Sequence, residues 1–103
     1  MAKYRVTTYS ISIKKDSKDI ERVYLDASLI NSKGNIKSVY YWMVDDSRAS
    51  IQSIYNDISQ GLTYAVTNNL SIEISEYPER TYLFFSLPSQ NGKVNLQYTG
   101  AKI

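Results

Sequence analysis

The stretch that decides the fold is residues 81–96, "TYLFFSLPSQNGKVNL". Four bulky apolar or aromatic residues stand side by side at its start, from Tyr82 to Phe85. Asn91-Gly92 then separates this run from a second strand pattern, and an Asn-Gly pair in that position favours a β-hairpin. A strand with apolar residues on both faces needs both faces covered. Either the protein covers them with its own layers, or one face is kept for a ligand or partner.

The first half of the chain has the period of two that is typical of half-buried strands. Its β-branched and aromatic residues suit a pleated surface. Three strand patterns, at residues 4–15, 20–30 and 36–44, are separated by the turn sequences "DSKD" (16–19) and "NSKGN" (31–35). The first half therefore predicts a three-strand meander.

The period then changes to that of a helix. Apolar residues recur at i, i+3, i+4 and i+7, one stripe of a short helix. They are Ile51, Ile54, Tyr55 and Ile58. Gly61 is interpreted as the C-terminal cap, so the predicted helix has about three turns. Such a short helix is not stable alone, so its stripe should pack on the sheet.

The start of this helix holds the only adjacent pair of carboxylates, Asp45-Asp46. Two carboxylates can share a proton or bind magnesium. Neighbouring side chains diverge, however, and negative charge is favoured at a helix N-terminus. The pair is therefore interpreted as part of the helix start, with Ser47 or Ser50 as the N-cap.

The last third returns to strand patterns, at residues 62–67, 70–75, 81–87 and 94–99. The whole chain of 103 residues is predicted to be a single domain (1–103). The predicted fold class is α+β, a twisted antiparallel sheet of six to seven strands with one helix packed on it. The strands are those of the meander, followed by three to four after the helix. Phe85 and Ile54 are expected in the core.

Composition excludes several kinds of chemistry. The chain has no cysteine and no histidine, so thiolate nucleophiles, disulfides, sulfur-ligated metals and histidine-based triads are impossible. Glycine-rich phosphate loops are absent from the sequence as well. We expect no enzymatic activity, no cofactor, no metal site and no catalytic residues. Without a signal peptide or a long apolar run, the protein is expected to be cytoplasmic and not membrane-bound.

Charge and aromatic content point to binding. The net charge is only +2 and basic residues are scattered among acidic ones, so a nucleic-acid partner is not expected. Ten tyrosines suit half-buried strand positions, and they also suit interfaces and the stacking of planar ligands. One helix cannot cover the apolar surface of "VYYWMV" and "TYLFFSL", so a homo-oligomer with a two-fold interface is predicted.

The anchors "SIQSIYNDISQG" (50–61), Tyr82-Leu83, Pro88, Gly92 and Asn95-Leu96 resemble a small bacterial and phage family of unknown function with a "YL…P…G…NL" ending. Phe84 stands where that family usually has an arginine. The size and element order also resemble phage proteins that oppose the Thoeris defence. This second resemblance implies an oligomeric sponge, which sequesters a cyclic ADP-ribose-type signal without cleaving it.

The leading hypothesis is therefore a non-enzymatic protein that binds a nucleotide-like small molecule. We expect the base of this ligand to stack on Tyr82 or Phe84. Asn91 and Asn95 are expected to hydrogen-bond to its polar edges. Arg80 or Arg48 is expected to contact its phosphate. A second hypothesis is a module that docks an aromatic face on a host protein. The third is single-stranded nucleic-acid binding, which would weaken steeply with salt.

Overall fold

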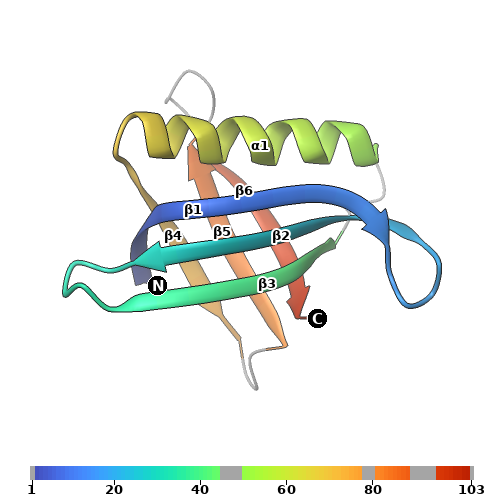
Figure 1. The fold of residues 1–103 in the computed structure, drawn as a ribbon, viewed down its shortest axis with the longest axis horizontal. Helices are drawn as coiled ribbons and strands as arrows, with labels where there is room; N and C mark the ends of the chain where they lie inside the picture. Colours follow the sequence, from blue (N-terminus) through green and yellow to red (C-terminus); the bar gives the residue numbers. More distant parts are fainter. Residues whose placement is uncertain (1, 45–49, 78–80, 89–94, 103) are drawn as a thin grey trace.

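The computed structural model describes residues 2–44, 50–77, 81–88 and 95–102. The elements follow the order β1 (Ala2–Lys15), β2 (Glu21–Ile30), β3 (Ile36–Val44), α1 (Ile51–Thr67), β4 (Ser71–Glu76), β5 (Tyr82–Pro88) and β6 (Asn95–Lys102) (Figure 1). The strands are antiparallel and close into a barrel in the order β1-β2-β3-β6-β5-β4. The predicted α+β fold is confirmed, with six strands and one helix in the described part of the chain. Among the described residues no helix has the length and apolar character needed to cross a membrane.

The barrel consists of two three-stranded sheets, and they cross each other (Figure 1). β1, β2 and β3 form one sheet, and β4, β5 and β6 form the other. The sheets join at two short corners, where β1 pairs with β4 from Ala2 to Arg5 and β3 pairs with β6 from Tyr41 to Val44. Beyond these corners β1 no longer pairs with β4, and β3 no longer pairs with β6. β1 and β3 therefore each have one edge that no described strand covers.

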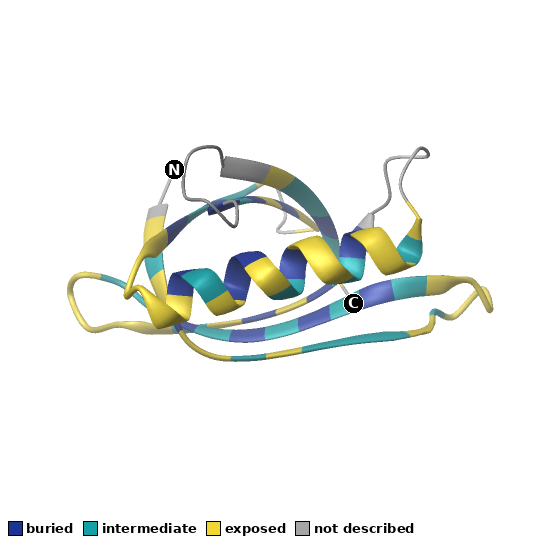
Figure 2. Cartoon of the chain, turned by 90° about the horizontal axis from the view of Figure 1, so that it is seen from above, coloured by how far each residue is buried: buried dark blue, intermediate teal, exposed yellow. Residues whose placement is uncertain are grey.

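The helix covers the edge of β1. In Figure 1 it runs along β1, and Figure 2 shows buried positions recurring along one side of it. That side carries Ile54, Ile58, Leu62 and Ala65. The hydroxyl groups of Tyr9 on β1 and Thr63 on α1 are hydrogen-bonded at 2.6 Å. The helix is therefore held on the barrel by a buried apolar stripe and a polar contact beside it.

Barrel closure buries the inner face of each strand. In β2, exposed or half-buried residues alternate with Val23, Leu25, Ala27 and Leu29. The inner residues of β3 and β5 are Val39, Tyr41 and Met43, and Leu83, Phe85 and Leu87. Phe85 and Ile54 lie in the core, as predicted. The two sheets thus cover one face of "VYYWMV" and of "TYLFFSL" without a second copy of the chain.

The predicted end of the helix is wrong. The helix continues through Gly61 to Thr67, so the short strand predicted at residues 62–67 does not exist. The apolar stripe continues with Leu62 and Ala65, and burial of these side chains outweighs the low helix propensity of glycine. Asn68 is the C-cap, and its backbone N–H donates to the Tyr64 carbonyl oxygen.

The predicted start of the helix is confirmed. The predicted turns between strands at residues 16–19 and 31–35 are confirmed as well. Ser50 is the N-cap, and its hydroxyl accepts a 3.1 Å hydrogen bond from the Ser53 N–H. Ser47, Asp45 and Asp46 lie outside the described residues, as does the predicted turn at residues 90–92. In the turn at 31–35, Gly34 has the positive φ, +84°, that glycine adopts without strain.

The turn at residues 16–19 is organised by one carboxylate. Asp16 Oδ1 accepts hydrogen bonds from the backbone N–H groups of Lys18 and Ile20 at 2.8 and 3.0 Å. Arg22 Nε donates to Asp16 Oδ2 at 2.8 Å. The hydrogen bond from Arg22 is the main reason why the pKa of the Asp16 carboxyl is lower than usual.

Candidate functional site

The edge of β3 is the part of the barrel that lacks a cover among the described residues. β2 pairs with β3 along Ile36–Trp42, but β6 reaches β3 only at Tyr41. The first five residues of β3, Ile36 to Tyr40, therefore have a described strand on one side only. The equivalent edge of β1 lies under α1 (Figure 1). This difference between the two edges leaves room for a pocket beside β3.

A pocket of about 430 Å³ lies at this edge. Its volume falls within the usual range of small-molecule sites. Its lining comes from β2, from β3 and from the ends of β4 and β6: Tyr24, Lys37, Ser38, Val39, Tyr40, Tyr41, Glu76 and Lys102. We call it the β3 pocket. Three of the lining residues are tyrosines and two are lysines, so aromatic surface and positive charge meet in one place.

The charged groups of the β3 pocket are partly neutralised. Lys37 forms an ion pair with Glu76, and both side chains are partly buried. The Tyr41 hydroxyl donates to Glu76 Oε2 at 3.4 Å. Lys102 is exposed and forms no ion pair with any described residue. Two lysines and one glutamate leave the pocket with a net charge of +1, which favours an anionic ligand.

Gly100 makes room for the Tyr41 side chain. A Cβ at Gly100 would lie 2.9 Å from Tyr41 Cβ and 2.8 Å from Met43 Cε. Real Cβ atoms do not approach so closely, so only glycine lets the Tyr41 ring pass over β6 at this point. Tyr41 is 4% exposed. The buried ring of Tyr41 packs against Gly100, and its hydroxyl group contacts Glu76 at the end of β4.

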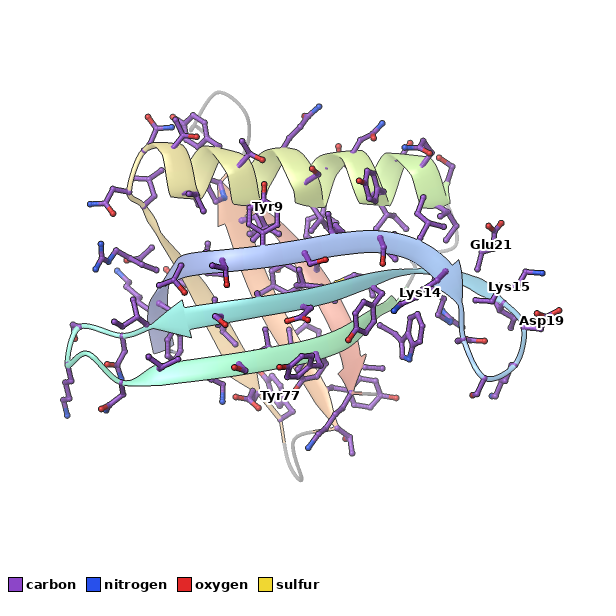
Figure 3. The ribbon with its side chains drawn as sticks, in the orientation of Figure 1. Tyr9, Lys14, Lys15, Asp19, Glu21 and Tyr77 are labelled. Carbon is purple, nitrogen blue, oxygen red and sulfur yellow. The ribbon has the colours of Figure 1, made fainter. Side chains whose placement is uncertain are left out.

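Tyr24 and Tyr40 supply the outer aromatic wall. Tyr40 is 47% exposed. The Tyr24 ring packs edge-on against Trp42, with centroids 5.2 Å apart, and Lys14 Nζ lies 3.9 Å from the Tyr24 centroid. Figure 3 shows Lys14 near the end of β1. Burial, and then the negative charge of Asp26, raise the pKa of the Tyr24 hydroxyl.

The residues predicted from the sequence are not in this pocket. Tyr82 and Phe84 are 50% and 45% exposed on the outer face of β5. Asn95 pairs with Pro88 in the ladder, and its side chain lies outside the description. Asn91, Arg80 and Arg48 lie outside the described residues. The described part of the structure thus brings only Tyr82 and Phe84 of the predicted set onto one surface.

Sequence reasoning missed the residues that do converge. Lys37 and Lys102 are 65 positions apart and look like ordinary surface lysines in the sequence. They meet because closure of the barrel brings the end of β6 beside β3. Tyr24, Tyr40 and Tyr41 belong to the tyrosine surplus that the sequence does show, but no local pattern indicates which of the ten share a pocket.

Comparisons of the chain with protein-family models, with curated proteins and with solved structures found no match. The resemblance to phage sponge proteins therefore rests on size and element order alone. The function has to be argued from the pocket and its chemistry.

Proposed function

We propose that the protein is a non-enzymatic, cytoplasmic binding protein that captures a nucleotide-like anion in the β3 pocket. In this proposal it acts as a phage anti-defence sponge, sequestering a cyclic nucleotide-type signal. The observation that carries the proposal is the convergence of three tyrosines and two lysines on one pocket of ligand size. Tyrosine offers a π face and a hydroxyl, and lysine offers a charge for phosphate.

The roles follow from the exposure of each group. Tyr40 is half exposed beside the open edge of β3, so its ring is available for stacking on a base. Lys102 lacks an ion-pair partner among the described residues, so its ammonium is the group to meet a phosphate. Glu76 already accepts from Lys37 and Tyr41. It can hold Lys37 in place and also accept from an exocyclic amine of the ligand.

Calorimetry with cyclic ADP-ribose isomers and cyclic dinucleotides tests the proposal directly. Lys102→Met removes the charge and keeps an apolar stem, and it should weaken binding by roughly tenfold. Lys18→Met is the matched control because Lys18 is exposed in the turn between β1 and β2, away from the pocket lining. If none of these ligands gives heat with the parent protein, the nucleotide-type ligand is wrong.

A second pair of variants separates the β3 pocket from the site predicted by the sequence. Tyr40→Leu and Tyr82→Leu each remove one half-exposed ring. Loss of affinity in Tyr40→Leu alone supports the β3 pocket. Loss in Tyr82→Leu alone would move the ligand to the outer face of β5, beside Phe84. Both variants should keep the parent's stability because neither ring is in the core.

A second candidate function is docking on another protein. A row of three neighbouring residues favours this function. On the outside of the barrel, Ala101 on β6 lies between Trp42 on β3 and Tyr82 on β5. Half-exposed aromatic rings around a small residue are suited to protein interfaces. A pull-down from bacterial lysate distinguishes the two functions. A stoichiometric protein partner, lost in Tyr82→Leu and without nucleotide in the denatured extract, favours docking.

A further inference from the structure

A second, smaller hollow lies on the outside of the barrel, away from the β3 pocket. It has a volume of about 200 Å³ and belongs to the sheet of β4, β5 and β6. Its lining residues are Glu73, Ser75, Tyr77, Phe84, Phe85, Ser86 and Gln97. It shares no lining residue with the β3 pocket. The two sites can therefore be studied separately.

Two aromatic rings form a corner of this hollow. The centroids of Tyr77 and Phe84 are 5.1 Å apart, and the ring planes meet at 86°. Both side chains are about half exposed, at 49% and 45%. Figure 3 shows Tyr77 where β4 ends. Its backbone N–H donates to the Tyr82 carbonyl oxygen at 3.0 Å, which fixes this end of β4 against β5. The perpendicular rings thus present two π surfaces on a backbone held by the ladder.

A carboxylate stands beside this corner. Glu73 lies two residues before Ser75 on β4, and Ser75 is directly opposite Phe84. Glu73 and Phe84 are therefore diagonal neighbours, a spacing that long side chains can bridge. Glu73 makes no hydrogen bond or ion pair with the described residues. Lys3 is opposite Glu73 on β1, on the side away from Phe84.

We propose that this hollow is a site for an organic ammonium ion. The quadrupole of an aromatic ring attracts a cation placed over its face, and rings combined with a carboxylate are suited to alkylated ammonium groups. Ser75, Ser86 and Gln97 offer hydroxyl and amide oxygens to a polar end of such a ligand. The protein already makes one contact of this type, between the Lys14 ammonium and the Tyr24 ring.

NMR titration with choline tests this site, and 3,3-dimethylbutan-1-ol is the matched control ligand. The two molecules have the same shape, but the alcohol has carbon in place of the charged nitrogen. Choline should shift the amide signals of Glu73, Ser75, Phe84 and Ser86 in the millimolar range, and the neutral analogue should not. Equal shifts with both ligands, or none with choline at tens of millimolar, would overturn the proposal.

Two variants test the roles of the residues. Phe84→Leu keeps an apolar side chain without a π face, and Glu73→Gln keeps the shape without the charge. Each should weaken choline binding about fivefold, the factor that corresponds to 1 kcal/mol. Tyr82→Leu removes a half-exposed ring of the same strand that does not line the hollow, so its affinity should equal that of the parent. Unchanged affinity in Phe84→Leu and Glu73→Gln would place the cation elsewhere.

Discussion

Gly61 shows how one missing methyl group determines a packing distance. It is buried in the middle of α1, and a Cβ there would lie 2.9 Å from Leu87 Cβ and 3.3 Å from the Pro88 carbonyl oxygen. Gly→Ala in a helix normally stabilises by about 1 kcal/mol. Here the new methyl group would push the helix off β5, and overpacking costs about 1–3 kcal/mol. We expect Gly61→Ala to lower the free energy of unfolding by about 1 kcal/mol in urea denaturation.

A double-mutant cycle provides the control for Gly61. Leu87→Gly alone removes both the Cβ and the Cδ1 that a Cβ at Gly61 would contact, and the cavity that it creates should destabilise the protein. In the double variant Gly61→Ala/Leu87→Gly, the new methyl group no longer meets Leu87, so the combined loss should be smaller than the sum of the two single losses. Strict additivity would mean that the close contact with Leu87 does not determine the cost.

The ionisation of the Tyr98 hydroxyl predicts how the stability of the protein changes at alkaline pH. Burial, and then the negative charge of Asp57, raise the pKa of its hydroxyl to about 12. The unfolded chain releases this proton near pH 10, so the folded state binds more protons between about pH 10 and pH 12. Stability should therefore fall as pH rises through that window. The side chain is only partly buried, so solvent screening limits the loss to about 1 kcal/mol.

Tyr98→Phe removes this ionisation and keeps the ring that packs on Phe85. Its free energy of unfolding, followed by urea denaturation over the same pH range, should fall less steeply than that of the parent. Tyr82→Phe is the control because Tyr82 is half exposed. The same slope in Tyr98→Phe and in the parent would contradict the role of Tyr98.

The stability of α1 depends on its apolar stripe. Ile54 is 6% exposed in that stripe. An aspartate there would place an unpaired carboxylate in the core, which costs several kcal/mol out of a total stability of about 5–10 kcal/mol. We expect Ile54→Asp to unfold the chain, as measured by circular dichroism. Gln60→Asp, exposed on the same helix, should melt like the parent.

The helix also shows how far local sequence patterns reach. The apolar stripe and the cap candidates Ser47 and Ser50 predict where α1 begins, because both signals lie within a few residues of each other, and the structure has Ser50 as the N-cap. The prediction that the helix ends at Gly61 is wrong. A glycine near the end of a pattern favours a cap. Only the approach of β5, from a segment more than 20 residues later, explains why glycine is needed inside the helix.

The strands of the barrel can be predicted from the sequence, but the closure of the barrel cannot. Alternation of apolar and polar residues indicates a strand and its buried face, as in β2. Pairing of β3 with β6 and of β1 with β4 joins distant segments, and nothing local in the sequence indicates it. Closure supplies the cover that the apolar strands need. It also brings Lys102 to the edge of β3 and so creates the β3 pocket.

Hydrogen exchange measures whether the β3 edge is open in solution. In an antiparallel strand, successive residues direct their N–H groups to opposite sides. β2 binds one set of amides from Ile36 to Tyr40, so the alternate set should exchange quickly. In β2 itself, which has β1 and β3 on its two sides, the amides of Tyr24 to Leu29 should all be protected. If every amide of Ile36–Tyr40 exchanges slowly, another strand must cover the edge. If that protection is lost on dilution, the covering strand belongs to a second copy, and the homo-oligomer predicted from the sequence forms at the edge of β3.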